Sequence, residues 1–471
     1  MVKLRTIRGA MLILSVGICA VAQDNPPTQP TTPAPAFGQN APILNPDNPP
    51  LSGLDEPSLE LRTASRSFIS PMIQVGESGD SNGQNRIGGS GAEAVTTLLG
   101  AFDLQKFWPK SDLFLEYVGG AGIGNDPYYV RQLHAAGLEA VTRWRTGQVM
   151  LRDAFNYFPD GSYYSESGVG LPGYGIATGG LGLSLLPGIF RANNENGVGD
   201  IPRLQNTALL DAVQALTPRS AITLVGAYSN SHFYHNTDDL VNGDQTTVEA
   251  GYSHLLSRHD QIAGVYAFQL FRFPLNAGGE IYNYVLNLRW SHTISGRMSF
   301  IGEVGPQYTD LRANGTTSTS WSPNGRAILR YRFEHASLMA SYEKFVSQGS
   351  GFFAGANTQI ALLSLRRSLG RTYDLLAYGG YSHNKRLQAS PSNCIVGVTC
   401  AGVPANSYDE GFAGTTLRRH FGREFDVFVA YRFAEVAFDI PVPLSGAIGR
   451  INQRQIGTVG FEWHPKPTRI E

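Results

Sequence analysis

The stretch from Glu280 to His292 alternates between apolar and polar side chains, and this alternation constrains the fold more than any other feature. The even positions carry Tyr282, Tyr284, Leu286, Leu288 and Trp290. The odd positions include Asn283, Asn287, Arg289 and Ser291. Successive side chains of a β-strand point to opposite faces, so a strand here has one apolar face and one mostly polar face. Aromatic rings at both ends of the apolar face, with leucines between them, match a strand that faces lipid.

The same alternation recurs from about residue 67 onward, in segments of roughly 9 to 14 residues that suit tilted membrane strands. A half-buried strand of a soluble sheet alternates in the same way, so one such segment does not predict a membrane strand. The prediction rests on how often the segment recurs. About eighteen strands are expected, and a sixteen-strand barrel is the alternative. The first strand, Phe68 to Glu77, contains Pro71, which removes one hydrogen-bond donor. The clearest copies are residues 246–254, 261–270, 325–333, 423–433 and 455–464.

The connections alternate between short and long, which is a second and independent sign. Barrels of the bacterial outer membrane have short periplasmic turns and long external loops, whereas a soluble sandwich has no reason to keep this alternation. Short connections are expected near 108–112, 145–147, 217–219, 255–260, 293–296, 334–336, 369–372 and 419–422. Long connections are expected near 79–90, 123–130, 159–202, 234–244, 309–324, 347–357, 385–407 and 437–451.

The composition supports the same class. Charged residues make up 16% of the 471 residues, below the usual value of about 25%, while 54 Gly, 21 Tyr and 24 Phe are abundant. No apolar run in the sequence reaches the roughly 18 residues of a membrane helix. The net charge of −1 argues against a nucleic-acid partner, which requires a basic surface. The predicted fold class is therefore all-β, a transmembrane antiparallel up-and-down β-barrel.

The chain divides into four expected parts. Residues 1–22 have the basic start, apolar core and small residues of a secretory signal peptide. Residues 23–64 are rich in Pro and Thr and predict a disordered periplasmic segment. Residues 65–464 form the expected barrel, and 465–471 form a C-terminal tail. Cys394 and Cys400, the two cysteines that follow the signal, predict a disulfide in an oxidising compartment.

This exported chain of alternating strands ends its last strand in Gly457-Thr-Val-Gly-Phe-Glu-Trp463. In this it resembles bacterial outer-membrane β-barrels of the porin type, over about residues 65–464. The resemblance is one of architecture and has no signature motif. It implies an outer-membrane location with both termini in the periplasm, contact with outer-membrane lipids, and recognition by the outer-membrane assembly machinery. Members of this class commonly end on an aromatic residue, whereas here His464 to Glu471 follow Trp463.

The predicted functional residues are the charged side chains on the polar faces of the strands, because a charge at the lipid midplane is costly. Two interpretations of this face stay open: a wall of mutually paired charges, or a basic strip at 326–332 that faces acids across the pore and selects solutes. A second predicted set is an aromatic girdle at the periplasmic interface, formed by Trp108, Trp144, Trp290 and Trp463, with Trp321 in a long loop. The candidate pore-lining residues are Arg143, Arg152, Glu249, Arg289, Glu303, Arg326, Arg330, Arg332, Glu343, Glu424, Asp426 and Arg432.

Function follows from these expectations. The apolar loop 159–202 is expected either to fold into the barrel mouth or to pack on a neighbouring loop or subunit. Ser253-His254 and Ser291-His292 place Ser and His on opposite faces of a strand, so no catalytic pair and no enzyme is expected. No cofactor or metal site is expected. The sequence predicts a channel for passive diffusion of small hydrophilic solutes, as a monomer or an oligomer. The alternatives are an export conduit for a polymer such as polysaccharide, or a plugged structural or adhesive barrel.

Overall fold

The computed structural model describes ten ranges of the chain. The signal peptide, the Pro-rich segment, the Cys394–Cys400 disulfide and the loop 159–202, all predicted from the sequence, lie outside the described residues. No helix of sufficient length and apolar character to cross a bilayer occurs in the ranges described. These ranges are 67–81, 92–124, 130–158, 203–233, 240–273, 279–313, 316–349, 351–387, 405–439 and 451–470.

Eighteen long antiparallel strands and one short strand form a single sheet. The bounds are β1 Phe68–Asp80, β2 Glu93–Phe107, β3 Ser111–Ile123, β4 Val130–Trp144, β5 Gly147–Phe158, β6 Arg203–Thr217, β7 Ser220–Phe233, β8 Gly243–Leu255, β9 Asp260–Arg272, β10 Glu280–Ser295, β11 Met298–Ala313, β12 Thr316–Arg332, β13 Ala336–Ser347, β14 Ala356–Leu369, β15 Tyr373–Arg386, β16 Ser407–Phe421, β17 Phe425–Phe438, β18 Ile451–Trp463 and β19 Thr468–Arg469.

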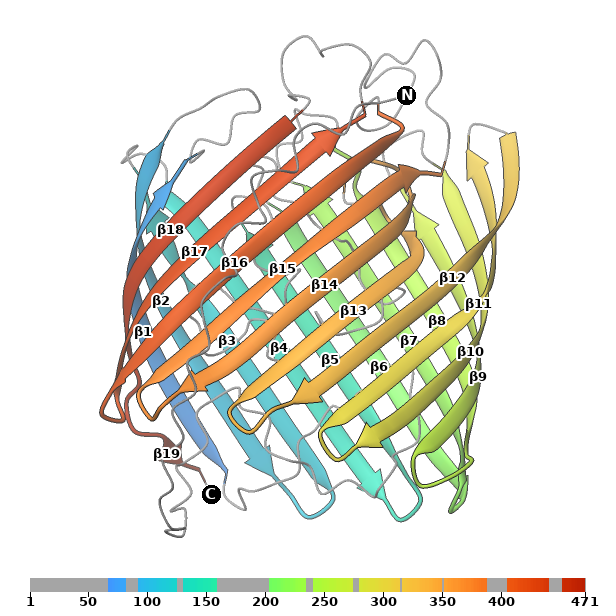
Figure 1. The fold of residues 1–471 in the computed structure, drawn as a ribbon, viewed down its shortest axis with the longest axis horizontal. Helices are drawn as coiled ribbons and strands as arrows, with labels where there is room; N and C mark the ends of the chain where they lie inside the picture. The colour runs from blue at the N-terminus through green and yellow to red at the C-terminus, as the bar shows by residue number, and fades with distance from the viewer. Residues whose placement is uncertain are drawn as a thin grey trace. The chain divides into compact units, whose positions relative to one another are not determined.

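The sheet closes on itself between β1 and β18 (Figure 1). Their register runs from Ile73 opposite Trp463 to Asp80 opposite Ile456. Each long strand also pairs with its neighbours in the chain, so neither β1 nor β18 is left as an open edge. The short β19 continues the seam by pairing Thr468 with Ile69 of β1. The predicted up-and-down barrel of eighteen strands is confirmed, and β1 is present although it contains Pro71.

The two faces of the strands separate apolar from polar side chains as the alternation predicts. On β10, the outward Leu286 and Leu288 are 57% and 59% exposed, whereas the inward Asn283 and Arg289 are 0% exposed. The same split holds on β17, where Val429 and Tyr431 point outward and Arg432 is buried inside. The exposed outer row is apolar in the middle of these strands and therefore forms the surface that suits lipid.

One of the predicted connections is wrong, and one connection of the structure was not predicted. The expected long loop 309–324 is absent, because β11 continues to Ala313 and β12 begins at Thr316. Trp321, expected in a loop, lies on β12 opposite Tyr308, with ring centroids 5.0 Å apart. Residues 317–321 are all exposed, so neither face shows the alternation that reveals a strand in lipid. The sequence prediction also missed the connection between β9 and β10, at 273–279.

The eight short turns gather at one end of the barrel, here called the short-turn end; the other is the long-loop end (Figure 1). Four of the five tryptophans lie near the short-turn end. Trp108 follows β2 and Trp144 ends β4, and each is 44% exposed. Trp290 of β10 and Trp463 of β18 are 42% and 37% exposed. Rings at this level, partly exposed on the outer face, have the position that an interface girdle requires.

The outer row can be tested at Leu288. Replacing Leu288 with Arg places a charge on the apolar face, which costs about 2–4 kcal/mol near a bilayer midplane. We expect less assembled barrel in the membrane fraction, measured by heat-modifiable migration on SDS gels. Leu288→Phe keeps the surface apolar and should assemble normally. Equal assembly of the Arg and Phe variants would contradict the lipid-facing assignment.

Candidate functional site

A row of alternating charges crosses four neighbouring strands on the inner face of the barrel. Arg289 of β10 lies opposite Glu303 of β11, Glu303 opposite Arg326 of β12, and Arg326 opposite Glu343 of β13. Arg289 Nε donates to Glu303 Oε2 at 3.0 Å, and Arg326 Nε lies 3.3 Å from Glu343 Oε1. We call these four residues the charge ladder. Opposite charges placed directly across an antiparallel pair stabilise the pairing of the strands.

Other buried polar side chains contact the charge ladder. Glu249 of β8 lies 3.7 Å from Arg289 Nη2, and Asn287 Nδ2 donates both to Glu303 and to Asn324 Oδ1, the latter at 3.0 Å. Arg289 and Glu249 have fully buried side chains. Buried ions without partners are strongly unfavourable, so this part of the inner face holds together as a network. The Arg289 side chain has no exposed surface and is held between Glu249 and Glu303.

A second pair of contacts lies on the inner face of the N-terminal strands. Arg152 of β5 donates through Nε and Nη2 to Glu139 Oε2 of β4, at 3.0 and 2.7 Å. Arg143, nearer the short-turn end, donates to Asp112 of β3 at 2.5 Å. These contacts match the interpretation of a mutually paired wall. They also show that each pair is local, formed by strands that are adjacent in the chain.

Arg454 and Asp80 form an ion pair across the closing seam, and the sequence analysis missed it. Arg454 Nε of β18 donates to Asp80 Oδ1 at 2.9 Å and Oδ2 at 2.8 Å of β1. Both side chains are 3% exposed. The two residues are 374 positions apart, so only the closed ring brings them together. The sequence offered one sign of this pair: both residues fall on inward-facing positions of their alternating strands.

The remaining predicted residues lie at or near the short-turn end, except Arg432. Arg432 of β17 is buried on the inner face. Arg330 is half-buried and Arg332 is exposed. Arg332 lies opposite Ser337 of β13, and Ser337 lies opposite Arg366 of β14. Glu424 lies in the turn before β17 and not on a strand face. The expected basic strip of 326–332 is therefore divided: Arg326 is paired within the wall, and the other two approach the mouth.

A connecting segment, residues 348–355, folds into the barrel at the long-loop end. Its described residues are buried, with Phe352 and Phe353 at 2% and 0% exposure. The segment joins β13 to β14, yet Gly351 accepts a backbone hydrogen bond of 2.7 Å from Val241, which precedes β8. Gly349, Gly351 and Gly355 adopt φ of 87°, 78° and 86°, a backbone region that favours glycine.

The aromatic side chains of this inner segment pack against strands from two sides of the ring. Phe352 contacts Tyr408 of β16 and Phe438 of β17, with centroids 5.3 and 5.1 Å apart. Phe233, at the end of β7, belongs to the same cluster. Strand β7 and strand β16 lie on opposite sides of an eighteen-strand ring, so this cluster reaches across the mouth. The Phe-Phe pair within a glycine-rich connection was the sequence signal for it.

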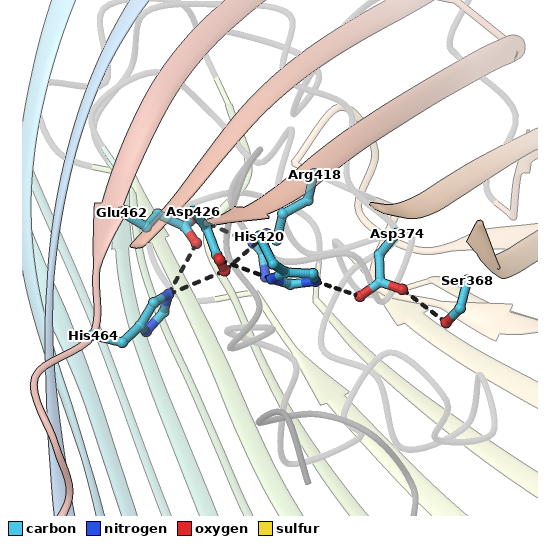
Figure 2. Close-up of polar contacts among 7 residues, drawn as sticks. All are labelled: Ser368, Asp374, Arg418, His420, Asp426, Glu462 and His464. Carbon is cyan, nitrogen blue, oxygen red and sulfur yellow. Dashed lines mark hydrogen bonds and ion pairs between the residues drawn. The ribbon is translucent and has the colours of Figure 1, made fainter. Parts of the chain in front are cut away.

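Seven polar residues form a connected group on the inner face at the short-turn end (Figure 2). We call it the C-terminal cluster: Ser368, Asp374, Arg418, His420, Asp426, Glu462 and His464. They come from five consecutive strands, β14 to β18, and from the residue after β18. Sequence analysis singled out only Asp426, because histidines spread along the chain gave no spacing motif.

His420 joins two carboxylates within this cluster. Its Nδ1 lies 2.8 Å from Asp426 Oδ1 and its Nε2 lies 3.0 Å from Asp374 Oδ2. A carboxylate only accepts, so both ring nitrogens must donate and the ring is the charged imidazolium. Ser368 Oγ donates to the other oxygen of Asp374 at 2.8 Å. The chain of contacts therefore fixes both carboxylates in orientation.

His464 approaches the cluster from the segment that follows β18. Its Nε2 lies 3.5 Å from Asp426 Oδ2 and 3.4 Å from Glu462 Oε2. Burial alone would lower the pKa of the His464 imidazole, but its contacts with these two carboxylates outweigh burial and raise the pKa to about 9. The imidazole is therefore positively charged at neutral pH and balances part of the negative charge beside it.

A Ser–His contact between described residues lies on the outer face of the barrel, away from the lumen. His254 Nδ1 is 2.8 Å from Ser220 Oγ, and Tyr252 donates to the same hydroxyl at 3.0 Å. Tyr252 and His254 occupy outward positions of β8, whereas Ser253 points inward and is buried. This places Ser253 and His254 on opposite faces, as predicted. The Ser220 contact joins the start of β7 to the end of β8 at the short-turn end.

Comparison with solved structures found barrels with low sequence identity to this chain, among them OpdQ, OccK2 and FrpB. No protein-family model matches the chain, and no curated protein matches it. OpdQ of Pseudomonas aeruginosa is 10% identical with a TM-score of 0.40, over 86% of this chain and 100% of that chain. OccK2 (OpdF) of the same organism, in complex with glucuronate, is 11% identical with a TM-score of 0.42, over 85% and 98%. The FrpB iron transporter of Neisseria meningitidis is 9% identical with a TM-score of 0.40, over 85% and 83%.

The charge ladder can be tested by removing its central cation. Arg289→Leu leaves Glu249 and Glu303 buried without their shared counter-charge, and breaking such a pair costs about 3–5 kcal/mol. We expect a lower free energy of unfolding in urea, measured on the purified protein in lipid vesicles. Arg272 pairs with Glu280 at 3.2 Å on the surface, so Arg272→Leu is the matched control and should cost about 0–1 kcal/mol. Similar losses in the two variants would contradict a buried network.

Proposed function

We propose that this protein is an outer-membrane channel for the passive diffusion of small hydrophilic solutes. The observation that carries the proposal is a closed barrel of eighteen strands with an apolar outer face and a charged, hydrogen-bonded inner face. Barrels of about this size enclose an aqueous lumen unless something fills it. Charged side chains such as Arg152 and Arg289 require an interior that is polar, because they are not tolerated toward lipid.

The inner segment 348–355 supports a channel that is narrowed at its long-loop end. Phe352 and Phe353 pack across the mouth, and the hydrogen bond from Val241 to Gly351 holds the segment there. Solutes would then be selected first by size and only second by charge. The same observation favours a second candidate function, a structural barrel whose lumen is plugged at this point.

Charge selection in this proposal acts at the short-turn end. The charge ladder compensates Arg326 and Arg289 within the wall, so these residues present little net field to a solute. Arg332 of β12 and Arg366 of β14 are exposed inward positions with Ser337 of β13 between them. Guanidinium groups keep their charge throughout the physiological range, so anions would meet a permanently positive site at this mouth.

The proposal includes the orientation of the barrel in the membrane and its partners there. The short turns and both termini would lie in the periplasm, with the long loops outside, as the resemblance to outer-membrane barrels implies. Trp108, Trp144, Trp290 and Trp463 would then form the periplasmic aromatic girdle in contact with lipid headgroups. The assembly machinery of the outer membrane would insert the barrel.

Conduction can be measured in planar lipid bilayers. Wild-type protein should open channels in potassium chloride, and Phe352→Ala combined with Phe353→Ala should raise the single-channel conductance, because the two rings narrow the mouth. Swelling of liposomes in sugars of increasing size should extend to larger sugars in the double variant. Trp321→Ala, which changes an exposed aromatic on β12, should leave both unchanged.

Each conduction outcome decides between the two candidates. A closed wild-type barrel that opens only in the double variant would favour the plugged structural barrel. Channels of identical conductance in wild type and double variant would show that the inner segment lies outside the path.

Orientation can be measured with epitope tags in intact cells. A tag within residues 388–404 should bind antibody without permeabilisation, because it would lie outside the cell. A tag between Glu334 and His335, in a short turn, should bind only after the outer membrane is opened. If only the tag between Glu334 and His335 binds antibody in intact cells, the orientation is the opposite one, with both termini outside.

A further inference from the structure

We propose that Asp426, Glu462 and His464 form a binding site for a divalent transition-metal ion at the short-turn end of the barrel. Asp426 comes from β17, Glu462 from β18, and His464 from the segment after β18. One donor atom of each residue, two carboxylate oxygens and one imidazole nitrogen, lies within 4.8 Å of the other two. Figure 2 shows the three side chains converging.

The separations fit metal ligands better than hydrogen-bonded partners. His464 Nε2 lies 3.5 Å from Asp426 Oδ2 and 3.4 Å from Glu462 Oε2, whereas N–H···O bonds are normally about 2.7–3.2 Å long. Two ligands bound tetrahedrally at about 2.0–2.1 Å lie about 3.3–3.4 Å apart. The imidazole nitrogen therefore already stands at a ligand-to-ligand distance from both oxygens.

An orphaned polar atom points into the same space. The Glu462 side chain is 0% exposed, and its Oε2 has no hydrogen bond, as is also true of His464 Nε2. The 3.4 Å approach of His464 Nε2 is longer than a hydrogen bond, so it replaces the lost hydration of this buried oxygen only in part. A bound cation would compensate this loss directly.

Neighbouring residues hold the other oxygen of each carboxylate, which leaves Asp426 Oδ2 and Glu462 Oε2 on the side of His464, with Arg418 Nε 4.0 Å from Asp426 Oδ2. Arg418 Nη2 donates to Glu462 Oε1 at 3.2 Å, and His420 donates to Asp426 Oδ1 at 2.8 Å. In Figure 2, Arg418 and His464 lie on opposite sides of the two carboxylates. Contacts of this kind, made by residues behind the ligands, orient carboxylates for metal binding and commonly change affinity by about 10–100-fold when removed.

The donor set selects the class of ion. One imidazole with two carboxylates suits Zn²⁺ and related transition metals, whereas Mg²⁺ and Ca²⁺ prefer oxygen ligands alone. The charge of the ion would balance both carboxylates, taking over from the imidazole proton, which must leave on binding. The His464 side chain is 25% exposed, so water can complete the coordination.

Equilibrium binding of Zn²⁺ to the full-length protein tests the site. Chelator-treated protein in detergent should bind one Zn²⁺ per chain by isothermal titration calorimetry, with little binding of Mg²⁺. His464→Gln and Glu462→Gln should each weaken binding at least tenfold, and His420→Asn, a positioning variant, should weaken it by less than ligand removal. The control is His383→Gln, because His383 pairs with Asp409 on another part of the barrel, and it should bind Zn²⁺ as wild type does.

Heat-modifiable migration on SDS gels verifies that each variant is an assembled barrel before its binding is measured. Two results would overturn the proposal. One is an assembled wild-type barrel that binds no Zn²⁺ at millimolar concentration. The other is Zn²⁺ binding that is equally strong in wild type and in the His464→Gln and Glu462→Gln variants, which would place the ion elsewhere.

Discussion

The rest of this structure depends on the closing contact between β1 and β18. Backbone N–H and C=O groups cannot remain unpaired in hydrocarbon, so a sheet that crosses a membrane must have no open edge. The eight-residue register from Ile73 opposite Trp463 to Asp80 opposite Ile456 removes that edge. The buried pair of Arg454 and Asp80 reinforces the same seam from inside, and the short β19 extends it beyond Trp463. Strands separated by nearly the whole chain are thereby joined.

Closure then decides where charge can be placed. Once the outer row faces lipid, every strongly polar side chain must lie on the inner row or near a membrane surface. The inner row accommodates these charges by pairing them between neighbouring strands, as Arg289, Glu303, Arg326 and Glu343 show. Charges that are neutralised in this way stabilise the wall and leave selection to the two mouths. At one mouth the aromatic inner segment crosses the barrel, and at the other lie exposed arginines and the largely buried C-terminal cluster.

The C-terminal cluster shows how the seam and the chemistry are linked. His464 follows Trp463, the residue that pairs with both Ile73 of β1 and Phe425 of β17. The end of β18 therefore holds the start of the C-terminal segment beside Asp426 and Glu462. His464 thus adds an imidazole that completes a charged group on the inner face.

The sequence by itself determined the class of fold, the approximate number of long strands and the face of each side chain in the clean strands. It did so because a strand between lipid and a polar interior repeats with period two, a pattern that residues such as Tyr284 and Leu286 display without any tertiary information. Where both faces meet water the period disappears, which is why the continuation of β12 through Trp321 was missed. Only the tertiary structure decided which charges meet. The pairing of Asp80 with Arg454 and the reach of Phe352 across the mouth join residues from distant strands, and the approach of His464 to Asp426 depends on the register of β18 against β17. Those contacts depend on the register and closure of the ring, which local alternation does not encode.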